Sequence, residues 1–302
     1  MEGLSKTFSV IIPTYRRARQ LDELLSDLEG QDFENLREEV EVIIVTEEPD
    51  EEVRRVIEEH AGRGVLEIVP VFSERRLGLP GARNAGVERA RGRFLIFLDD
   101  DLRLGRDFLR TCRRFAGLGN FCFRVEGAGG KVVERLLPGK VILPLGLILG
   151  GFGFELGGIV EVSHLPGACF VVRRECLEVV KFDERLGEGN AYLEDCDFSF
   201  RLRRTGERLY YVSTYSVRHL PPEAGGCREP DYRRWLTYYW SHKAYFVRKN
   251  GGDVFLLPAF LISLLECALL SVGRGKIFLR ELFGGFRRGI GGKLGDSLRK
   301  SG

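Results

Sequence analysis

The stretch FLIFLDDDLRLG, residues 94–105, decides the fold, because five apolar residues lead directly into three consecutive aspartates. A short apolar run bounded by polar residues is typical of a strand buried on both faces, as in a parallel sheet. Asp99, Asp100 and Asp101 then lie where this strand leaves the core. In open α/β sheets, ligands bind beyond the carboxyl ends of the strands. The stretch therefore predicts a core strand with a ligand site at its end.

Strand-like and helix-like segments alternate on the amino-terminal side of this stretch. Expected strands cover residues 8–13, 39–45, 66–72 and 94–98, and the helical patterns between them cover residues 14–31, a segment ending at residue 60, and residues 81–91. Such alternation is typical of βαβ units and a parallel sheet. We therefore predict an α/β fold with a mostly parallel central sheet flanked by helices, formed by residues 1–227. Residues 228–302 are predicted to form a C-terminal helical appendage.

The rhythm changes after residue 120, where short strand-like runs are separated by glycine and proline. The segment RLLPGKVILPLGLILGGFGFELGG, residues 135–158, is apolar but rich in glycine and contains two prolines. It is interpreted either as a mobile flap or acceptor-side segment, or as a buried hairpin.

Composition excludes several classes of protein. The chain of 302 residues has 46 Lys and Arg against 44 Asp and Glu, so its global charge indicates no nucleic-acid partner. The seven cysteines show no C-x-x-C spacing, which favours reduced thiols in the cytoplasm over disulfides or structural zinc. The first residues lack the pattern of a secretory leader, so we expect a cytoplasmic location.

The three aspartates have two interpretations. Asp is a favoured capping residue, so they could form a solvated turn. However, alternate residues of an extended segment project to the same side, so Asp99 and Asp101 can converge on one hard cation such as Mg²⁺ or Mn²⁺ holding a diphosphate. His219, at the end of the strand-like run RLYYVSTYSVRH, would suit such an ion as a third ligand, although a lone histidine is more often a surface or core residue.

Two further motifs carry charge at predicted helix starts. Glu194, Asp195 and Asp197 precede a helical pattern, where they could merely complement the helix dipole or supply a general base that deprotonates a hydroxyl. In RLGLPGARNAGVERARG, residues 76–92, Gly78 permits a tight turn, and Arg83 near the following helix start would favour a diphosphate.

The order of these motifs resembles the inverting family 2 glycosyltransferases, which have the GT-A, Rossmann-like fold of nucleotide-diphospho-sugar transferases. The pieces that carry the resemblance are FSVIIPTYRR, the acidic end of the second strand, GLPGARNAG, FLDDD, GACFVVRRE, KFDERLGEGNAYLEDCDFSFRLRRTG and the strand ending in His219, covering about residues 8 to 220. The resemblance implies a metal-dependent, inverting transfer of a sugar from a nucleotide-diphosphate sugar to a hydroxyl acceptor. Attachment of the C-terminal region to a membrane would fit an acceptor that is lipid-linked or part of an envelope glycan.

The resemblance also assigns roles to residues of this chain. It places Pro13, Thr14, Tyr15 and Arg16 around the nucleobase and ribose, and Gly78 and Arg83 at the donor phosphates. Asp99 and Asp100 would lie on the ribose or sugar side, and Asp101 and His219 would bind Mn²⁺ or Mg²⁺. Asp195, beside Glu194, would be the base. The nucleobase reader falls at Thr46 or Glu47, where TEEPD departs from the aspartate pair usual in the family. The donor is therefore left open between a UDP-sugar and a GDP-sugar.

Two other functions compete with this interpretation. A sugar-phosphate nucleotidyltransferase has a similar sheet, but it typically carries a glycine-rich, lysine-bearing loop after the first strand, and PTYRRARQ contains neither. A catalytically silent protein that retained the fold, acting as a scaffold or a lipid-binding module, is the second alternative. The set of acidic residues and His219 argues against it.

The C-terminal region raises the question of a membrane. Residues 254–272 are 19 mostly apolar residues that include Glu266, and residues 273–302 contain eight basic residues against two acidic ones. This segment could attach to a membrane surface, pack as a soluble helix or dimer interface, or span the bilayer. The basic tail would suit anionic lipid, so the cytoplasmic face of the cell membrane is the expected location. The oligomeric state is left open.

Overall fold

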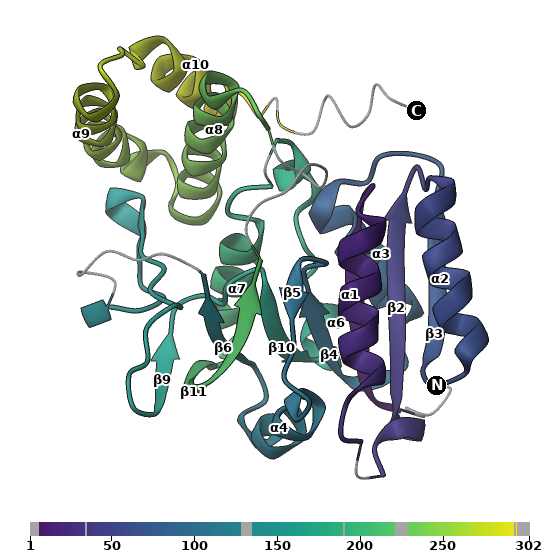
Figure 1. The fold of residues 1–302 in the computed structure, drawn as a ribbon. Helices are drawn as coiled ribbons and strands as arrows, with labels where there is room; N and C mark the ends of the chain where they lie inside the picture. Colours follow the sequence, from purple (N-terminus) through teal and green to yellow (C-terminus); the bar gives the residue numbers. More distant parts are fainter. Residues whose placement is uncertain are drawn as a thin grey trace.

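The computed structural model describes residues 6–33, 35–127, 135–189, 191–220, 229–292 and 294. A nine-stranded sheet in the order β3-β2-β1-β4-β10-β6-β11-β5, with β9 paired to β11, forms its centre (Figure 1). The strands span β1 Lys6–Thr14, β2 Val40–Glu47, β3 Glu67–Ser73, β4 Gly92–Leu98, β5 Leu102–Arg103, β6 Phe121–Glu126, β9 Ile159–Val162, β10 Cys169–Arg173 and β11 Leu209–His219. The helices span α1 Ala18–Glu29, α2 Glu51–Arg63, α3 Gly78–Arg89, α4 Phe108–Phe115, α6 Arg174–Val179, α7 Glu194–Arg204, α8 Tyr232–Gly251, α9 Leu256–Arg274 and α10 Leu279–Ile290.

The α/β fold predicted from the sequence is confirmed. Strands β3, β2, β1 and β4 run parallel and are joined by helices, as the alternating pattern predicts. The sheet is mixed beyond this half, because β10 joins antiparallel between β4 and β6, and β5 and β9 pair antiparallel with β11. Glycine and proline separate the short strands of this second half, so its pairing left no periodic signal in the sequence.

Two helical layers cover the sheet, and alternation within the strands explains both. Along β1, Phe8, Val10 and Ile12 face one core, whereas Ile11 faces the other. The first core contains side chains of α1, α2 and α4, and the second contains side chains of α3, α6 and α7. The apolar strands therefore form the middle layer of three.

Two short strands lie outside the main sheet. The predicted hairpin segment contains β7 Val141–Ile142 and β8 Leu147–Ile148, joined by a 3₁₀ turn and packed near α8 and α9. Their side chains are half-buried. The structure therefore shows a half-buried hairpin in this segment, and its role as a mobile flap or acceptor-side segment stays a prediction.

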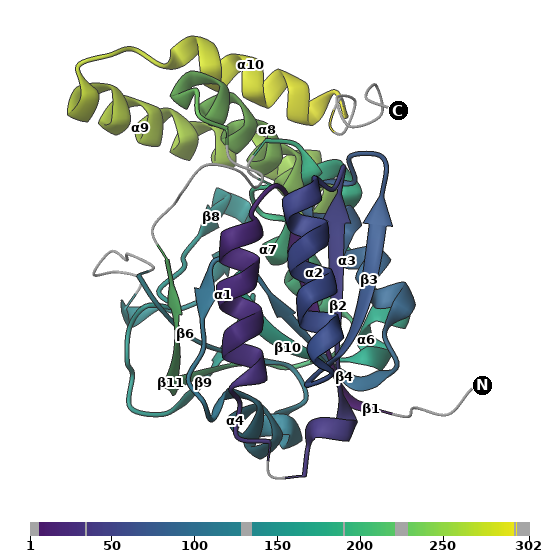
Figure 2. The same cartoon turned by 45° about the vertical axis from the view of Figure 1, so that its right-hand side comes forward.

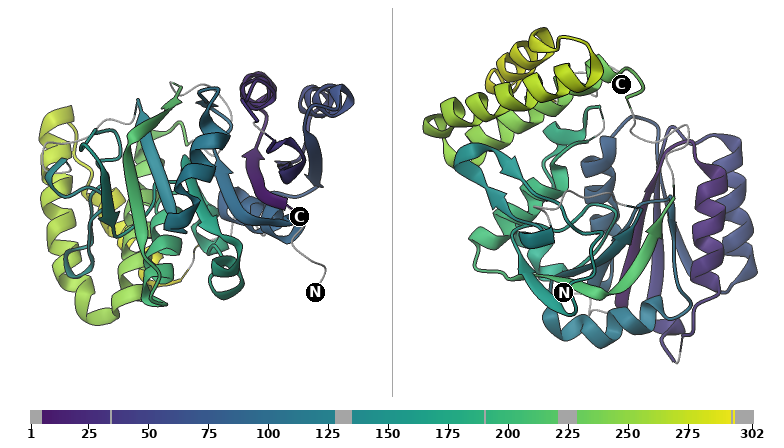
Figure 3. Two further views of the ribbon diagram at one scale, coloured as in Figure 1. Left: turned by 90° about the horizontal axis from the view of Figure 1, so that it is seen from below. Right: turned by 60° about the vertical axis from the view of Figure 1, so that its left-hand side comes forward.

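The C-terminal helices form a separate layer. Figure 2 shows α8, α9 and α10 together, beyond the end of the molecule toward which β2 and β3 point, and the same helices form the green and yellow layer in both views of Figure 3. The predicted boundary at 227/228 falls outside the described residues, so the division into two domains stays a prediction. Among the described residues, the helix Asp253–Arg274 is long and apolar enough to cross a membrane, with a mean hydropathy of 2.2, and only 17% of its most apolar window is buried.

Candidate active site

The three aspartates follow β4, as the sequence predicts. The Asp99 amide donates to the Ala168 carbonyl at 2.9 Å, which extends the pairing of β4 with β10 by one residue. Asp100 and Asp101 are buried, whereas Asp99 is half-buried. The acidic turn is therefore part of the core rather than a solvated loop.

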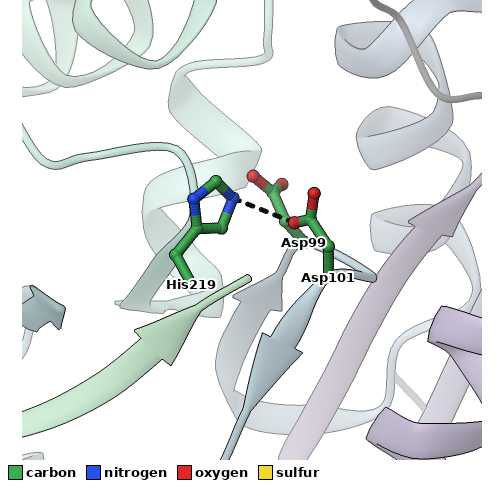
Figure 4. Close-up of side chains that lie close together, drawn as sticks. All are labelled: Asp99, Asp101 and His219. Carbon is green, nitrogen blue, oxygen red and sulfur yellow. Dashed lines mark ion pairs between the residues drawn. The ribbon is translucent and has the colours of Figure 1, made fainter. Parts of the chain in front are cut away.

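Asp99, Asp101 and His219 converge at this point (Figure 4). One ligand atom from each lies within 4.8 Å of the others, and His219 Nε2 lies 2.9 Å from Asp101 Oδ1. His219 ends β11, where its register partner in β5 is Leu102, so the sheet itself places the imidazole beside Asp101. Two carboxylates and an imidazole form a donor set that suits Mn²⁺ or Mg²⁺. The residues present therefore fit the predicted metal.

Arg17, which the sequence analysis did not single out, neutralises the turn. Its Nη1 donates to Asp100 Oδ1 at 2.8 Å and to Asp101 Oδ2 at 2.9 Å, and the guanidinium is buried. Thr14 Oγ1 donates to Asp100 Oδ2 at 2.7 Å. Burial raises the pKa of Asp100 to about 6 despite these partners. Asp100 is thus held between Thr14 and Arg17, and its carboxylate links β1 to the metal ligands.

A second arginine ties Asp99 to the start of α7. Arg83 is fully buried, and its guanidinium donates to Glu194 Oε1, to Asp99 Oδ1 at 3.2 Å and to the Gly167 carbonyl at 2.9 Å. Burial raises the pKa of Glu194 to about 8, although Arg83 favours the charged carboxylate. Burial also raises the pKa of Asp99. Arg83 therefore holds both carboxyl groups in place by hydrogen bonds.

Beside this network lies a pocket of about 480 Å³. Its lining includes Asp99, Arg83, Glu194, Asp195 and Gly167. A Cβ atom added at Gly167 would lie 3.2 Å from Asp195 Oδ2, so glycine lets the backbone approach the carboxylate closely. The structure thus brings the predicted base, Asp195, into one pocket with the predicted metal ligand Asp99.

The loop before α7 sets the position of Glu194 and Asp195. Ala191 and Leu193 both adopt left-handed backbone conformations, with φ of 48° and 69°. For residues other than glycine this costs on the order of 1 kcal/mol or more each, and such strain clusters at functional sites. Glu194 and Asp195 form the first turn of α7, where the sequence predicts them to precede it. Asp195 Oδ1 accepts from the Cys196 amide at 2.7 Å within that turn.

His164 also lines the pocket and was missed by sequence reasoning. It is buried against Phe152, with ring centroids 5.2 Å apart, and its Nδ1 has no hydrogen-bond partner among the described residues. Burial lowers its pKa, although the nearby Asp195 carboxylate acts in the opposite direction. A lone histidine in SHLPGA carries no signal in the sequence, because only the fold reveals which histidines face a pocket.

The residues predicted around the nucleobase gather at the ends of β1 and β2. The Tyr15 hydroxyl donates to Glu48 Oε2 at 3.2 Å, and the Arg76 guanidinium lies 3.7 Å from the Tyr15 ring centroid. Glu47 is buried and already engaged, because its Oε2 accepts from the amides of Leu77 and Gly78 at 2.8 and 3.2 Å. Arg76 Nε lies 3.0 Å from the same oxygen.

Three residues that are predicted to bind the nucleotide differ in solvent exposure and in backbone conformation. Pro13 is buried within β1 beside Val45, whereas the Arg16 side chain is exposed and lies 3.7 Å from Glu48. Gly78 has φ of 68°, which explains a glycine at the start of α3. Glu48, next to the predicted Glu47, is the more accessible carboxylate at this end of the sheet.

Comparison with known proteins gives a consistent picture. Residues 9–180 match the sequence model of the family described as Glycosyl transferase family 2. The chain is 31% identical over 132 residues to the poly(ribitol-phosphate) β-N-acetylglucosaminyltransferase TarS of Staphylococcus aureus, a match that covers 42% of this chain and only 22% of TarS. It is 28% identical over 261 residues to the GalNAc(5)-diNAcBac-PP-undecaprenol β-1,3-glucosyltransferase of Campylobacter jejuni, covering 80% of this chain and 82% of that protein.

Solved structures with the same fold include the mannosyltransferase PcManGT from Pyrobaculum calidifontis in complex with GDP-Man and Mn²⁺. It has a TM-score of 0.60 and 16% identity, covering 95% of this chain and 88% of that one. The structure of S. aureus TarS 1–349 in complex with UDP-GlcNAc has a TM-score of 0.56 at 19% identity, covering 81% of this chain and 71% of that one.

Proposed function

Because this chain belongs to glycosyl transferase family 2, we propose that it transfers a sugar from a nucleotide-diphosphate sugar to a hydroxyl acceptor with inversion. The reaction would depend on a divalent cation, Mn²⁺ or Mg²⁺, held by Asp99, Asp101 and His219. Asp195 would act as the general base. The observation that carries this proposal is the joining of the Asp99–Asp101–His219 cluster to a pocket that contains Asp195.

The chain's own residues account for most of the proposed mechanism. Asp195 Oδ2 lies at the pocket wall, where it can accept the proton of an acceptor hydroxyl as that oxygen attacks the anomeric carbon. One displacement by an acceptor on the face opposite the leaving nucleotide inverts the configuration. A bound divalent cation would stabilise the negative charge that develops on the leaving diphosphate.

Arg83 and Glu194 would act chiefly by positioning. The buried Arg83 guanidinium bridges Glu194 and Asp99, so it fixes the distance between the metal cluster and the start of α7. Because Glu194 is buried against Arg83, Asp195 is the better placed of the two acids to meet an acceptor. A phosphate contact by Arg83 remains the prediction from the family resemblance.

The nucleotide would lie at the ends of β1 and β2. The Tyr15 ring, already stacked by Arg76, offers a flat surface for a base, and Glu48 lies beside its hydroxyl. Neighbours of the same fold have been crystallised with UDP-GlcNAc and with GDP-Man, so UDP and GDP are the nucleotides to test. The Campylobacter relative is named for an undecaprenol-linked acceptor, which supports a lipid-linked acceptor at a membrane surface here.

The two alternative functions make different demands on the site. A nucleotidyltransferase would bind a nucleoside triphosphate through a loop after β1, but that place is taken by Tyr15, Arg16 and Arg17. Arg17 is committed to Asp100 and Asp101. A silent scaffold would bind no donor.

Calorimetry of the full chain tests the proposal directly. UDP and GDP are titrated with and without Mn²⁺ into the wild type, into Asp101→Asn and into the exposed control Asp32→Asn. We expect one nucleotide to bind in a Mn²⁺-dependent manner to the wild type and the control but not to Asp101→Asn. At about 100 times Kd it should raise the free energy of unfolding by about 2.7 kcal/mol. Absence of binding by either nucleotide would favour the silent scaffold, and tight binding of a triphosphate alone would favour the nucleotidyltransferase.

A further inference from the structure

The outward side of α9 presents an apolar stripe to solvent. Leu257, Leu261, Leu265 and Leu269 recur every four residues with 67, 55, 59 and 67% of their surface exposed. Residues spaced in this way lie on one side of a helix. Val254, Val272, Ile277, Leu279 and Phe283 extend the exposed apolar surface into the neighbouring turns and α10. We define these nine residues as the outer face. Contiguous exposed apolar surface of this kind marks an interaction site.

The opposite side of α9 is fixed to the protein. Ala259, Ser263 and Cys267 are fully buried there. The single acidic residue of α9, Glu266, accepts from the buried Lys243 of α8 at 2.8 Å. Glu266, the acidic residue within the apolar segment 254–272, therefore points toward α8, so no charged residue interrupts the row of leucines on the outer face.

Positive charge borders the outer face. Arg274, Lys276, Arg280 and Arg287 are exposed in the turn after α9 and along α10. Within the described part of the chain, no carboxylate forms an ion pair with Lys276, Arg280 or Arg287. Glu281, the acid among them, is buried and paired with Arg233. A basic border around apolar side chains is complementary to anionic lipid headgroups around acyl chains.

From this complementarity we propose that the outer face docks the protein flat on an anionic lipid bilayer, with α9 lying parallel to the surface and not crossing it. A crossing helix would have to leave α8, which would carry Glu266 into hydrocarbon and leave the buried Lys243 of α8 without its partner, and both are costly. In the flat orientation the Glu266–Lys243 pair stays inside the protein and the leucines enter the interface.

The docked orientation also brings the pocket close to the lipid. Tyr192 lines the pocket and packs on Tyr239 of α8, with ring centroids 4.6 Å apart. The Tyr239 hydroxyl donates to Glu266 of α9 at 3.5 Å. Only α8 and α9 therefore lie between this part of the pocket and the outer face. This step rests on the proposed function, because it assigns the pocket an acceptor carried by a lipid.

Vesicle flotation of the full chain tests the docking without donor or metal. Vesicles of phosphatidylcholine alone are compared with vesicles that also contain phosphatidylglycerol. The triple variant Leu261→Gln, Leu265→Gln, Leu269→Gln is compared with a control of equally exposed apolar residues elsewhere, Val179→Gln with Ile159→Gln. We expect the wild type and the control to float with anionic vesicles, and each leucine lost to weaken binding about five- to tenfold. Circular dichroism and thermal melting of each variant establish that it is folded.

A charge variant tests the second part of the complementarity. Lys276→Glu, Arg280→Glu, Arg287→Glu should abolish the preference for phosphatidylglycerol, whereas the matched control Arg75→Glu, Arg89→Glu, Arg113→Glu should retain it. The proposal is overturned if the leucine triple variant floats like the wild type. It is also overturned if the wild type ignores vesicles and light scattering shows a dimer that the leucine variant dissociates, since the outer face would then be an interface between copies.

Calorimetric nucleotide binding of the same variants separates this proposal from the function. Loss of flotation with unchanged Mn²⁺-dependent nucleotide binding supports docking alone. Flotation by a protein that binds no nucleotide would leave the docking standing and remove the proposed function.

Discussion

Charged residues usually lie at the surface of a protein and apolar residues in its core, and the acidic turn after β4 and the outer face of α9 depart from this rule in opposite ways. At the turn, Asp100, Asp101 and Arg17 are charged and buried. On the outer face, leucines such as Leu257 and Leu269 are apolar and exposed. Buried charge and exposed apolar surface are both costly to a protein in water, so each indicates a function that only a partner completes. The partner of the first would be a cation with its diphosphate, and that of the second a lipid surface.

The largest expected effect tests whether Asp195 takes part in the reaction or only stabilises the fold. Asp195→Asn should lower kcat about a thousandfold, because an amide cannot accept the acceptor's proton. Nucleotide affinity and the melting temperature should stay near the wild-type values. Single-turnover transfer assays measure the first, and calorimetry measures the second.

The matched control lies two residues further along α7. Asp197 is fully buried and accepts from Arg201, from Lys249 at 2.8 Å and from Asn250 at 3.0 Å. Asp197→Asn should therefore destabilise the fold while retaining turnover at low temperature. If Asp195→Asn transferred sugar at the wild-type rate, Asp195 would not be the base.

The next largest effect concerns Arg17, whose guanidinium is the positive charge buried at the acidic turn. Arg17→Met leaves Asp100 and Asp101 buried without their guanidinium, so the free energy of unfolding should fall by about 3 kcal/mol. Urea denaturation measures the loss, and added Mn²⁺ should restore part of it by supplying charge to the same carboxylates. Arg19→Met, which removes an exposed arginine paired with Glu23, should change stability by less than about 1 kcal/mol. Equal losses in the two variants would show that the buried bridge contributes nothing special.

A smaller effect tests how the outer face is kept free of charge. Glu266→Leu leaves the Lys243 ammonium buried, so unfolding free energy should fall by about 2 to 3 kcal/mol. Adding Lys243→Met should recover most of that loss, since an apolar pair of similar volume needs no compensation. Denaturation of the wild type, both single variants and the double variant forms a double-mutant cycle. A double variant as unstable as the sum of the singles would contradict the pairing.

The smallest effect is a pH dependence of stability that arises from His242 in α8, the helix between the pocket and α9. His242 of α8 is buried, its Nδ1 lies 2.9 Å from the Tyr192 carbonyl, and burial lowers its pKa to about 4. Between pH 6.5 and 4 the unfolded histidine binds a proton that the folded one does not, so stability falls as the pH falls. The loss should reach about 2 kcal/mol by pH 5.

The matching variant isolates this histidine from other titrating groups. Glu188 and Arg288 also act on the His242 ring, the first favouring its protonation and the second opposing it. His242→Gln keeps a donor for the Tyr192 carbonyl but cannot titrate, so its stability should decline less between pH 6.5 and 5. Identical pH profiles for the two proteins, measured by urea denaturation, would show that His242 already titrates normally.

The sequence predicted those features that depend on local periodicity. The parallel half of the sheet follows from alternating strands and helices, and the convergence of Asp99, Asp101 and His219 follows from placing strand ends at one edge. The family resemblance is confirmed by the match over residues 9–180. The individual roles assigned to the site residues stay predictions.

What the sequence could not predict are contacts between distant side chains. Arg17 and Asp101 are 84 residues apart, and nothing in PTYRRARQ distinguishes the buried Arg17 from the exposed Arg16. Glu266 was visible as a charge within an apolar segment, but its direction depends on how α9 packs on α8. His164 likewise becomes a pocket residue only through folding.

The position of β10 has a consequence for how the chain is made. β10 fills the space between β4 and β6, and the Asp99 amide is paired only through Ala168. During synthesis, the four parallel strands emerge from the ribosome well before residues 169–173. Until β10 arrives, the edge of β4 has unpaired backbone groups beside an apolar strand, which favours aggregation of nascent chains. Thr14 and Arg17 can already hold Asp100 and Asp101 at that stage, whereas the β4 edge is still open, so slow translation through the segment before β10 would prolong the exposure of that edge.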